Sequence, residues 1–133
     1  MRQFFQVPTR VHNALMILCF ISKSNSKSPI PLSLISKYLK LSYEYLEHIV
    51  VPLKKAGLIK SFRGSNGGYK LDKELKDISL ADIIVALEGP IKVADCSTGG
   101  GCAVIDRCPS IKIWKKLQIE LNNTFKKIKL TDV

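Results

Sequence analysis

A chain of 133 residues, 46% of them hydrophobic, is long enough for one domain with a real core. Lysine and arginine number 21 against 11 aspartate and glutamate residues, so the formal net charge is +10. This excess favours a polyanionic partner such as nucleic acid over an acidic small substrate. The longest apolar run, Ala14 to Ile21, has about half the length that a bilayer requires, so we expect no membrane segment.

Two helical patterns open the chain. The run from Thr9 to Ile21 is apolar almost all round, which predicts a buried helix. Leu32, Ile35 and Leu39 then recur at the spacing of one helical face, which predicts a second and shorter helix. The turn after it leads directly into the next helical pattern.

A third helix is predicted from Tyr43 to Ala56, with Ser42 as its N-cap and Gly57 as its stop. Pro52 lies inside this helix, so we expect a kink or a break near Ile49 to Val51. Two short helices joined by a tight turn, with polar side chains at the start of the second, form a helix-turn-helix. In that arrangement the second helix enters the major groove of DNA.

A β-hairpin wing is predicted after the third helix. Leu58 to Phe62 and Tyr69 to Leu71 are two short strand-like runs, joined by a glycine-rich turn. The turn offers Arg63 and backbone amides to a phosphate chain or to a narrow minor groove. The alternative is a surface hairpin whose arginine binds nothing.

The predicted DNA contacts form two groups. Side chains at the start of the recognition helix are expected to contact base edges. Phosphates are expected to be bound by lysines, by Arg63 and by the backbone amides of the wing. Affinity should then fall steeply with salt, and a specific operator should bind better than random DNA. The base-contacting candidates are Ser42, Tyr43, Tyr45 and Glu47, and the phosphate-contacting candidates are Lys54, Lys60, Arg63, Gly67 and Gly68.

The last third of the chain contains two further helical patterns. Ser79 caps a helix from Leu80 to Leu87, and an amphipathic pattern over about residues 110–129 predicts a longer one. A small winged domain cannot cover a helix of that length, so its apolar stripe is expected to pack against a second copy of the chain. The alternative is a core helix of a monomer.

The predicted fold class is therefore mainly α with a small β-hairpin wing. We expect a winged helix-turn-helix with a long C-terminal dimerisation helix, built as one domain over residues 1–133. Its DNA-binding part would span about residues 1–75, followed by a cysteine loop at 96–108.

Three cysteines, Cys96, Cys102 and Cys108, have the spacing C-x5-C-x5-C. On an α-helix a six-residue step turns about 600°, so the thiols would point about 120° apart and would meet only from a loop. The glycine run Gly99 to Gly101 gives this loop conformational freedom. Three thiolates suit an iron–sulfur cluster or zinc. With Cys19 far upstream, the layout is poor for disulfides, so we expect a reducing cytoplasm.

With these features, the sequence resembles the Rrf-type winged-helix transcription regulators. The resemblance runs the whole length and is carried by Leu53 to Ile59, by Arg63 to Leu71, by Ile78 to Ile83 and by the three-cysteine loop. It implies a homodimer that binds a pseudo-palindromic operator in double-stranded DNA. It also implies an iron–sulfur cluster, of 2Fe–2S or 4Fe–4S type, held by Cys96, Cys102 and Cys108.

The resemblance also bears on a fourth cluster ligand. IscR-like members place a ligand histidine three residues after the last cysteine, where this chain has Ile111, which cannot ligate iron. NsrR-like members take the fourth ligand from the first helix of the other subunit, and the aligned residue is His12. We predict that His12 of one subunit completes the cluster of the other. The alternative is that His12 is a helix-surface or core histidine that is hydrogen-bonded locally, with Asp95, Asp106, Cys19 or a small thiol as the fourth ligand.

Other functions stay open at this point. The same fold could sense through zinc or through cysteine oxidation. Alternatively, an iron–sulfur carrier or electron-transfer protein could dock an acidic partner, although it would have no use for a wing. No nucleophile–base–orienter constellation is evident, so we expect no enzymatic activity. The signal, the operator sequence and the choice between repressor and activator are not set by these residues.

Overall fold

The computed structural model describes residues 3–24 and 27–133, so the remaining residues of the predicted DNA-binding part lie outside the described ranges. Its helices and strands, in chain order, are α1 (Thr9–Lys23), α2 (Leu32–Leu39), α3 (Tyr43–Lys55), β1 (Ile59–Phe62), β2 (Gly68–Leu71), α4 (Leu80–Glu88) and α5 (Ile111–Lys127). Short 3-10 turns are η1 (Leu75–Asp77), η2 (Asp95–Thr98), η3 (Ile105–Arg107) and η4 (Leu130–Asp132). The predicted class, a mainly helical winged helix-turn-helix with a long C-terminal helix, is confirmed.

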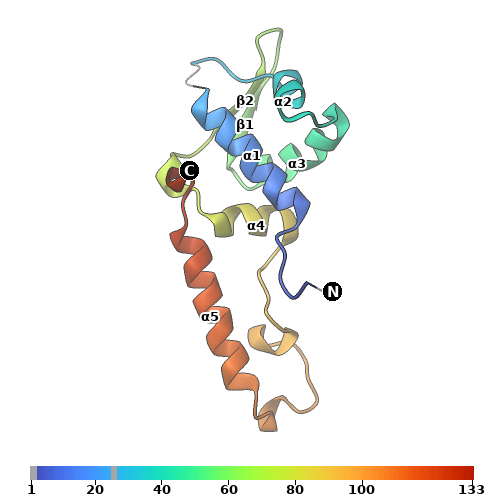
Figure 1. Cartoon of the computed structure of the whole chain (residues 1–133), viewed down its shortest axis with the longest axis vertical. Helices are drawn as coiled ribbons and strands as arrows, with labels where there is room; N and C mark the ends of the chain where they lie inside the picture. Colours follow the sequence, from blue (N-terminus) through green and yellow to red (C-terminus); the bar gives the residue numbers. More distant parts are fainter. Residues whose placement is uncertain (1–2, 25–26) are drawn as a thin grey trace.

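The elements form a body and an extension. Helices α1 to α4 and the hairpin make the body, and α5 extends from it beside the chain that descends from α4 (Figure 1). The core of the body is apolar and is centred on α1, whose Val11, Ala14, Ile17 and Leu18 are fully buried against α3 and α4. The expectation of a buried first helix is confirmed.

The recognition helix α3 begins as predicted and continues through its proline without interruption. The Ser42 hydroxyl accepts a hydrogen bond from the Tyr45 amide at 3.2 Å, which caps the first turn. The helix then runs unbroken through Pro52 to Lys55, so of the expected kink or break, the break is wrong. Leu46 and Leu53, before and after the proline, are both fully buried. Core packing on both sides therefore outweighs the hydrogen bond that proline removes.

The wing is an antiparallel hairpin in which Ile59 pairs with Leu71 and Phe62 with Gly68. A third segment joins it, because Ile30 and Tyr69 exchange two backbone hydrogen bonds of 2.9 and 2.8 Å. These bonds fasten the wing to the chain just before α2. Gly68 has a φ of +154°, and a Cβ at this position would clash with the Ile30 carbonyl.

Helix α4 is the last helix of the body, and the chain after it leads to α5. Its N-terminus is closed by a reciprocal capping box between Ser79 and Asp82. The chain after α5 returns to this point, since the Leu80 amide donates to the Ile128 carbonyl at 2.8 Å and the Leu130 amide to the Ile78 carbonyl at 2.9 Å. The C-terminal end of α5 is thus tied to the body, and the cysteine loop lies at the other end of α5 (Figure 1).

Candidate DNA-binding surface and cysteine loop

The start of α3 presents polar side chains to solvent. Ser42, Tyr43 and Glu47 are exposed, with Tyr43 at 50% of its full accessibility. Tyr45 is only half-buried and is already engaged, because its hydroxyl accepts a hydrogen bond from Asn13 Nδ2 at 2.9 Å. Three of the four predicted base-contacting residues therefore face solvent, and the fourth holds α3 against α1.

The predicted phosphate contacts lie at the end of α3 and along the wing. Lys54 and Arg63 are exposed, and neither has an ion-pair partner within residues 3–24 and 27–133. Lys60 is also exposed, and its Nζ lies 3.8 Å from Asp72 Oδ1. An exposed pair of this kind contributes little stability, so Lys60 stays available to a phosphate. Gly67, at the end of the hairpin turn, and Gly68, the first residue of β2, are half-buried.

Tyr69 of β2 joins the wing to the recognition helix, which the sequence interpretation missed. It is half-buried, and burial is the largest cause of its raised pKa, followed by the nearby Tyr43 hydroxyl and Glu47 carboxylate. The first residue after the wing glycines therefore lies beside the first turns of α3. Tyr69 thus places the start of β2 near the recognition helix.

Asn13 is a second residue that the sequence interpretation missed. It lies on the buried side of α1, with 7% of its surface exposed, and Tyr45 is the partner of its amide. A polar residue inside an otherwise apolar helical stripe was the available signal, because a buried amide must find a hydrogen-bond partner. The pair fixes the first turn of the recognition helix relative to α1.

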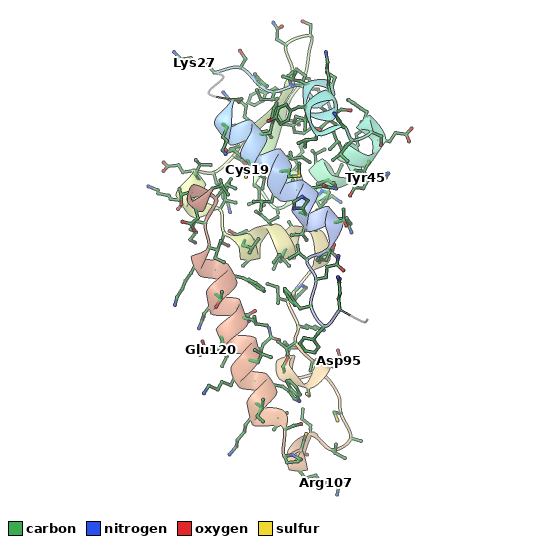
Figure 2. All side chains as sticks on the ribbon, viewed as in Figure 1. Cys19, Lys27, Tyr45, Asp95, Arg107 and Glu120 are labelled. Carbon is green, nitrogen blue, oxygen red and sulfur yellow. The ribbon has the colours of Figure 1, made fainter. Side chains whose placement is uncertain are left out.

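The cysteine loop occupies the far end of the molecule from the wing. Figure 2 marks its extent by Asp95, the first residue of η2, and by Arg107, at the tip. Cys96 is half-buried in η2, which packs against α5. Cys102 is exposed between the two 3-10 turns. Cys108 follows η3, and its Sγ lies 3.2 Å from Ser110 Oγ.

Local chemistry shapes two parts of this loop. The hydrogen bond from Ser110 is the largest cause of a lowered pKa at Cys108, which favours the thiolate there. Gly99 adopts a φ of +84°, and the Gly100 amide donates to the Asp95 carbonyl at 2.9 Å, which closes η2. The glycine run therefore bends the loop, as the sequence predicts.

The donor chemistry of the loop fits an iron–sulfur cluster, but the described residues of one chain do not form a closed site. All three loop cysteines are free thiols, which are the usual cluster ligands. In the described ranges, no three His, Cys, Asp or Glu side chains form a group that could hold a metal ion. Cys19 lies on α1 in the body, well away from the loop (Figure 2), so within one chain it cannot complete the set.

His12 does not join the cysteine loop of its own chain either. It is exposed on α1, which belongs to the body, whereas the loop lies at the distal end of α5. Its ring has no hydrogen-bond or ion-pair partner among the residues that the structure describes. His12 is therefore an exposed residue on the surface of α1, as one form of the alternative expects, and its role as a cluster ligand stays a prediction.

Helix α5 leaves much of its apolar side uncovered. Gln118 is its one buried residue, all of α5 being within the described ranges. On this side Ile113 is 63% exposed and Leu117 36%, and Ile128, the residue after the helix, is 42% exposed. Ile119 is 59% exposed but lies about 200° around the helix from Leu117. Exposed apolar side chains grouped along one helix mark an interaction surface.

Across the described chain, no helix is long and apolar enough to cross a bilayer.

Comparison with known proteins agrees with the fold. A family model described as "Rrf2: Iron-dependent Transcriptional regulator" matches residues 7–133. The HTH-type transcriptional regulator IscR of Vibrio atlanticus is 31% identical over 120 residues, which cover 90% of this chain and 69% of that protein. Such relatives are transcriptional regulators and not enzymes.

Solved structures extend the similarity to three dimensions. CymR, the global cysteine regulator of B. subtilis, superposes with a TM-score of 0.77 at 31% identity, covering 97% of this chain and 95% of that one. IscR of T. potens superposes with a TM-score of 0.71 at 31% identity, covering 97% of this chain and 85% of that one. The winged helix-turn-helix and the family match together establish that the chain belongs to the Rrf2 family of transcriptional regulators.

Proposed function

We propose that this Rrf2-family regulator acts as a homodimer whose affinity for an operator is controlled by an iron–sulfur cluster on Cys96, Cys102 and Cys108. The observation that carries the proposal is the position of the loop. Three free thiols lie on one loop at the distal end of α5, the helix with the uncovered apolar side. A change at the thiols therefore acts on the element through which two copies would pack.

The DNA side of the proposal uses the surface formed by α3 and the wing. The exposed side chains of Ser42, Tyr43 and Glu47 would meet base edges in the major groove. Arg63 at the wing would reach a phosphate or the minor groove, where arginine is electrostatically favoured. Such a regulator would act in the cytoplasm, where the operator DNA is.

The dimer is supported by α5. A protomer that exposes Ile113 and Leu117 on one side of α5 buries them when a second α5 packs alongside, which is the isologous contact of a two-fold dimer. The two recognition helices would then be held at a fixed separation. Half-site spacing in the operator would follow from that separation.

The cluster site draws on both protomers in this proposal. When bound, an iron–sulfur cluster supplies a centre whose stability and redox state respond to the surroundings. Cys96, Cys102 and Cys108 would hold it on one subunit, and His12 of the other subunit would be the fourth ligand. The exposed and unpartnered state of His12 among the described residues supports this assignment, and imidazole is an established ligand of iron–sulfur centres.

Mixed dimers test the cross-subunit ligand. One tagged chain carries His12→Ala, and the other carries Ser at all three loop cysteines. Ligation across the interface predicts that the purified mixed dimer binds one cluster with the wild-type visible spectrum, because each chain supplies what the other lacks. Ligation within one chain predicts an altered or absent spectrum in the same mixed dimer. His48→Ala, which changes an exposed histidine of α3, is the matched control and leaves the spectrum unchanged.

Control of DNA binding is tested separately. The operator is first selected from a random-sequence library, and fluorescence anisotropy then compares the cluster-loaded protein with the chelator-treated protein. The proposal predicts different affinities for the two forms and equal affinities for both forms of a Cys102→Ser variant. Equal affinities in the wild type would refute it.

A second candidate is the same regulator sensing through cysteine oxidation. The observation in its favour is that, within the described ranges, the three thiols do not form a closed metal-binding group, while Cys108 has a lowered pKa from its bond to Ser110. A thiol with a lowered pKa reacts faster with oxidants. A colourless protein whose operator affinity changes on mild oxidation, and returns with a reductant, would favour this version.

A further inference from the structure

The side chain of Gln118 binds the cysteine loop from the middle of α5. Its Oε1 accepts hydrogen bonds from the Val93 amide and from Ser97 Oγ, both at 2.8 Å. Its Nε2 donates to the Ile91 carbonyl at 2.7 Å and to Asn122 Oδ1 at 3.1 Å. The orientation of the amide is fixed, since a backbone amide can only donate and a carbonyl can only accept.

This network is unusual for its position in the fold. Gln118 is 5% exposed, and it is the one buried residue of a helix whose apolar side chains are largely half-buried or exposed. A glutamine amide offers two donors and two acceptor positions, and all four are used here. Three of the four bonds run to the segment from Ile91 to Ser97, which contains Cys96. The helix therefore holds the first loop cysteine through a polar contact and not through apolar packing alone.

The contact at Ser97 lies next to the thiol. The Ser97 hydroxyl is 2.8 Å from Gln118 Oε1 and 2.6 Å from the Ala94 carbonyl, and its single proton serves one of these acceptors at a time. Movement of Cys96 displaces Ser97, its neighbour in the chain, and so acts on Gln118. By contrast, Cys102 is exposed in the loop, and no residue of α5 is bonded to its thiol in the described structure.

We propose that Gln118 is a positioning residue, which fastens the Cys96 end of the cysteine loop to α5 and transmits the state of that cysteine to the dimerisation helix. The inference rests on the proposed function in one respect, because the state of Cys96 there means whether it holds an iron–sulfur cluster. The fastening itself is a property of the chain without any cluster. Breaking it frees Cys96 selectively and leaves the rest of the fold in place.

Site-resolved alkylation of the metal-free, reduced protein tests the fastening. Gln118→Met keeps the length and removes all four hydrogen bonds, and Ser97→Ala removes one of them from the loop side, where it cannot unfold α5. We expect Cys96 to react about tenfold faster in the first variant and about threefold faster in the second, as lost hydrogen bonds of this kind allow. Mass spectrometry reads Cys102 and Cys108 in the same sample, and their rates should not change.

Two internal controls make the result decisive. Asn123→Met places the same new side chain at an exposed position of α5 and should change no rate. Cys19, in the body, reports general unfolding, because its neighbourhood is independent of the loop. If Cys96 keeps its rate in both variants, or if all four cysteines accelerate together, the proposal is overturned.

A second readout separates this inference from the proposed function. In protein reconstituted with iron and sulfide, Gln118→Met should lose its visible absorbance to a chelator faster than wild type. The Gln118→Glu variant keeps an acceptor for Val93 and Ser97 but sets a carboxylate oxygen against the Ile91 carbonyl, so it should not restore the wild-type rate. If wild type and Gln118→Met lose their visible absorbance at equal rates, Gln118 does not transmit the state of Cys96 to α5. If wild type takes up no sulfide, the proposed function fails, and the alkylation experiment alone decides the role of Gln118.

Discussion

Replacing Tyr45 by phenylalanine tests the packing of the recognition helix. The change removes one oxygen, the acceptor for Asn13 Nδ2 at 2.9 Å. The Asn13 amide, in a residue only 7% exposed, is then left without the one partner that the described structure gives it. A buried donor without an acceptor costs about 1–3 kcal/mol. We therefore expect Tyr45→Phe to lower the free energy of unfolding by about 1–2 kcal/mol.

A double-mutant cycle isolates this bond. Asn13→Leu replaces the buried amide by an apolar side chain of similar size, so the half-buried Tyr45 hydroxyl turns to water at little cost. Once Asn13 is gone, Tyr45→Phe should cost almost nothing, and the two changes should be strongly non-additive. Tyr43→Phe, on the same turn but 50% exposed, is the matched control and should shift stability by less than about 0.5 kcal/mol.

Urea denaturation followed by circular dichroism measures these effects at one fixed protomer concentration, because the proposed dimerisation would add to the apparent stability. Operator binding supplies a second criterion. Tyr45→Phe should weaken all operator sequences alike, whereas Tyr43→Phe should change the discrimination between them. A Tyr45→Phe protein as stable as wild type, or additive effects in the cycle, would refute the role of Tyr45 as a support for α3.

Four further changes probe the wing, the cysteine loop and the dimer face. Gly68→Ala should detach the wing from Ile30 and weaken operator binding at least about tenfold, measured by anisotropy. Arg63→Ala should weaken binding to all sequences alike and reduce the slope of log affinity against log salt by about one. Ser110→Ala removes the largest cause of the lowered pKa at Cys108, so alkylation of that thiol should slow near neutral pH, and its pH profile should move upward. Leu117→Glu should convert the dimer to monomer in light scattering, because it places a charge on the uncovered apolar side of α5.

Matched controls accompany these changes. Gly101→Ala adds a methyl group where nothing lies within 4 Å, and it should leave binding unchanged. Asn123→Glu adds a charge at another exposed position of α5 and should leave the dimer intact. A Gly68→Ala protein with wild-type affinity, or a Ser110→Ala protein with an unchanged Cys108 profile, would contradict the respective argument. So would a dimeric Leu117→Glu protein, or an Arg63→Ala protein with the wild-type salt slope.

Much of the fold could be predicted because local signals and core packing agree. Ser42 and Ser79 cap the helices that follow them, and the glycines of the wing turn produce the hairpin. Pro52 is where local and tertiary preferences conflict, and there the buried turns of α3 prevail. A rule about isolated helices could not anticipate that outcome.

The candidate site was less accessible to sequence reasoning. The residue types identified the cysteine loop, but the arrangement of its thiols depends on long-range contacts that spacing does not encode. Asn13 and Gln118 were missed for the same reason, since their partners lie 32 and up to 27 residues away in the chain. A polar side chain in an apolar stripe was visible in both cases, and only the tertiary structure supplies its partner.

The most direct test of the central claim is one experiment on a single anaerobic preparation. The visible spectrum is recorded with iron and acid-labile sulfide counts, and operator affinity is measured on the same sample before and after a chelator removes the iron. The account predicts a coloured protein that contains sulfide and whose operator affinity changes when the colour is lost. A protein that stays colourless and free of sulfide after reconstitution, or one whose affinity is the same with and without the cluster, would contradict it.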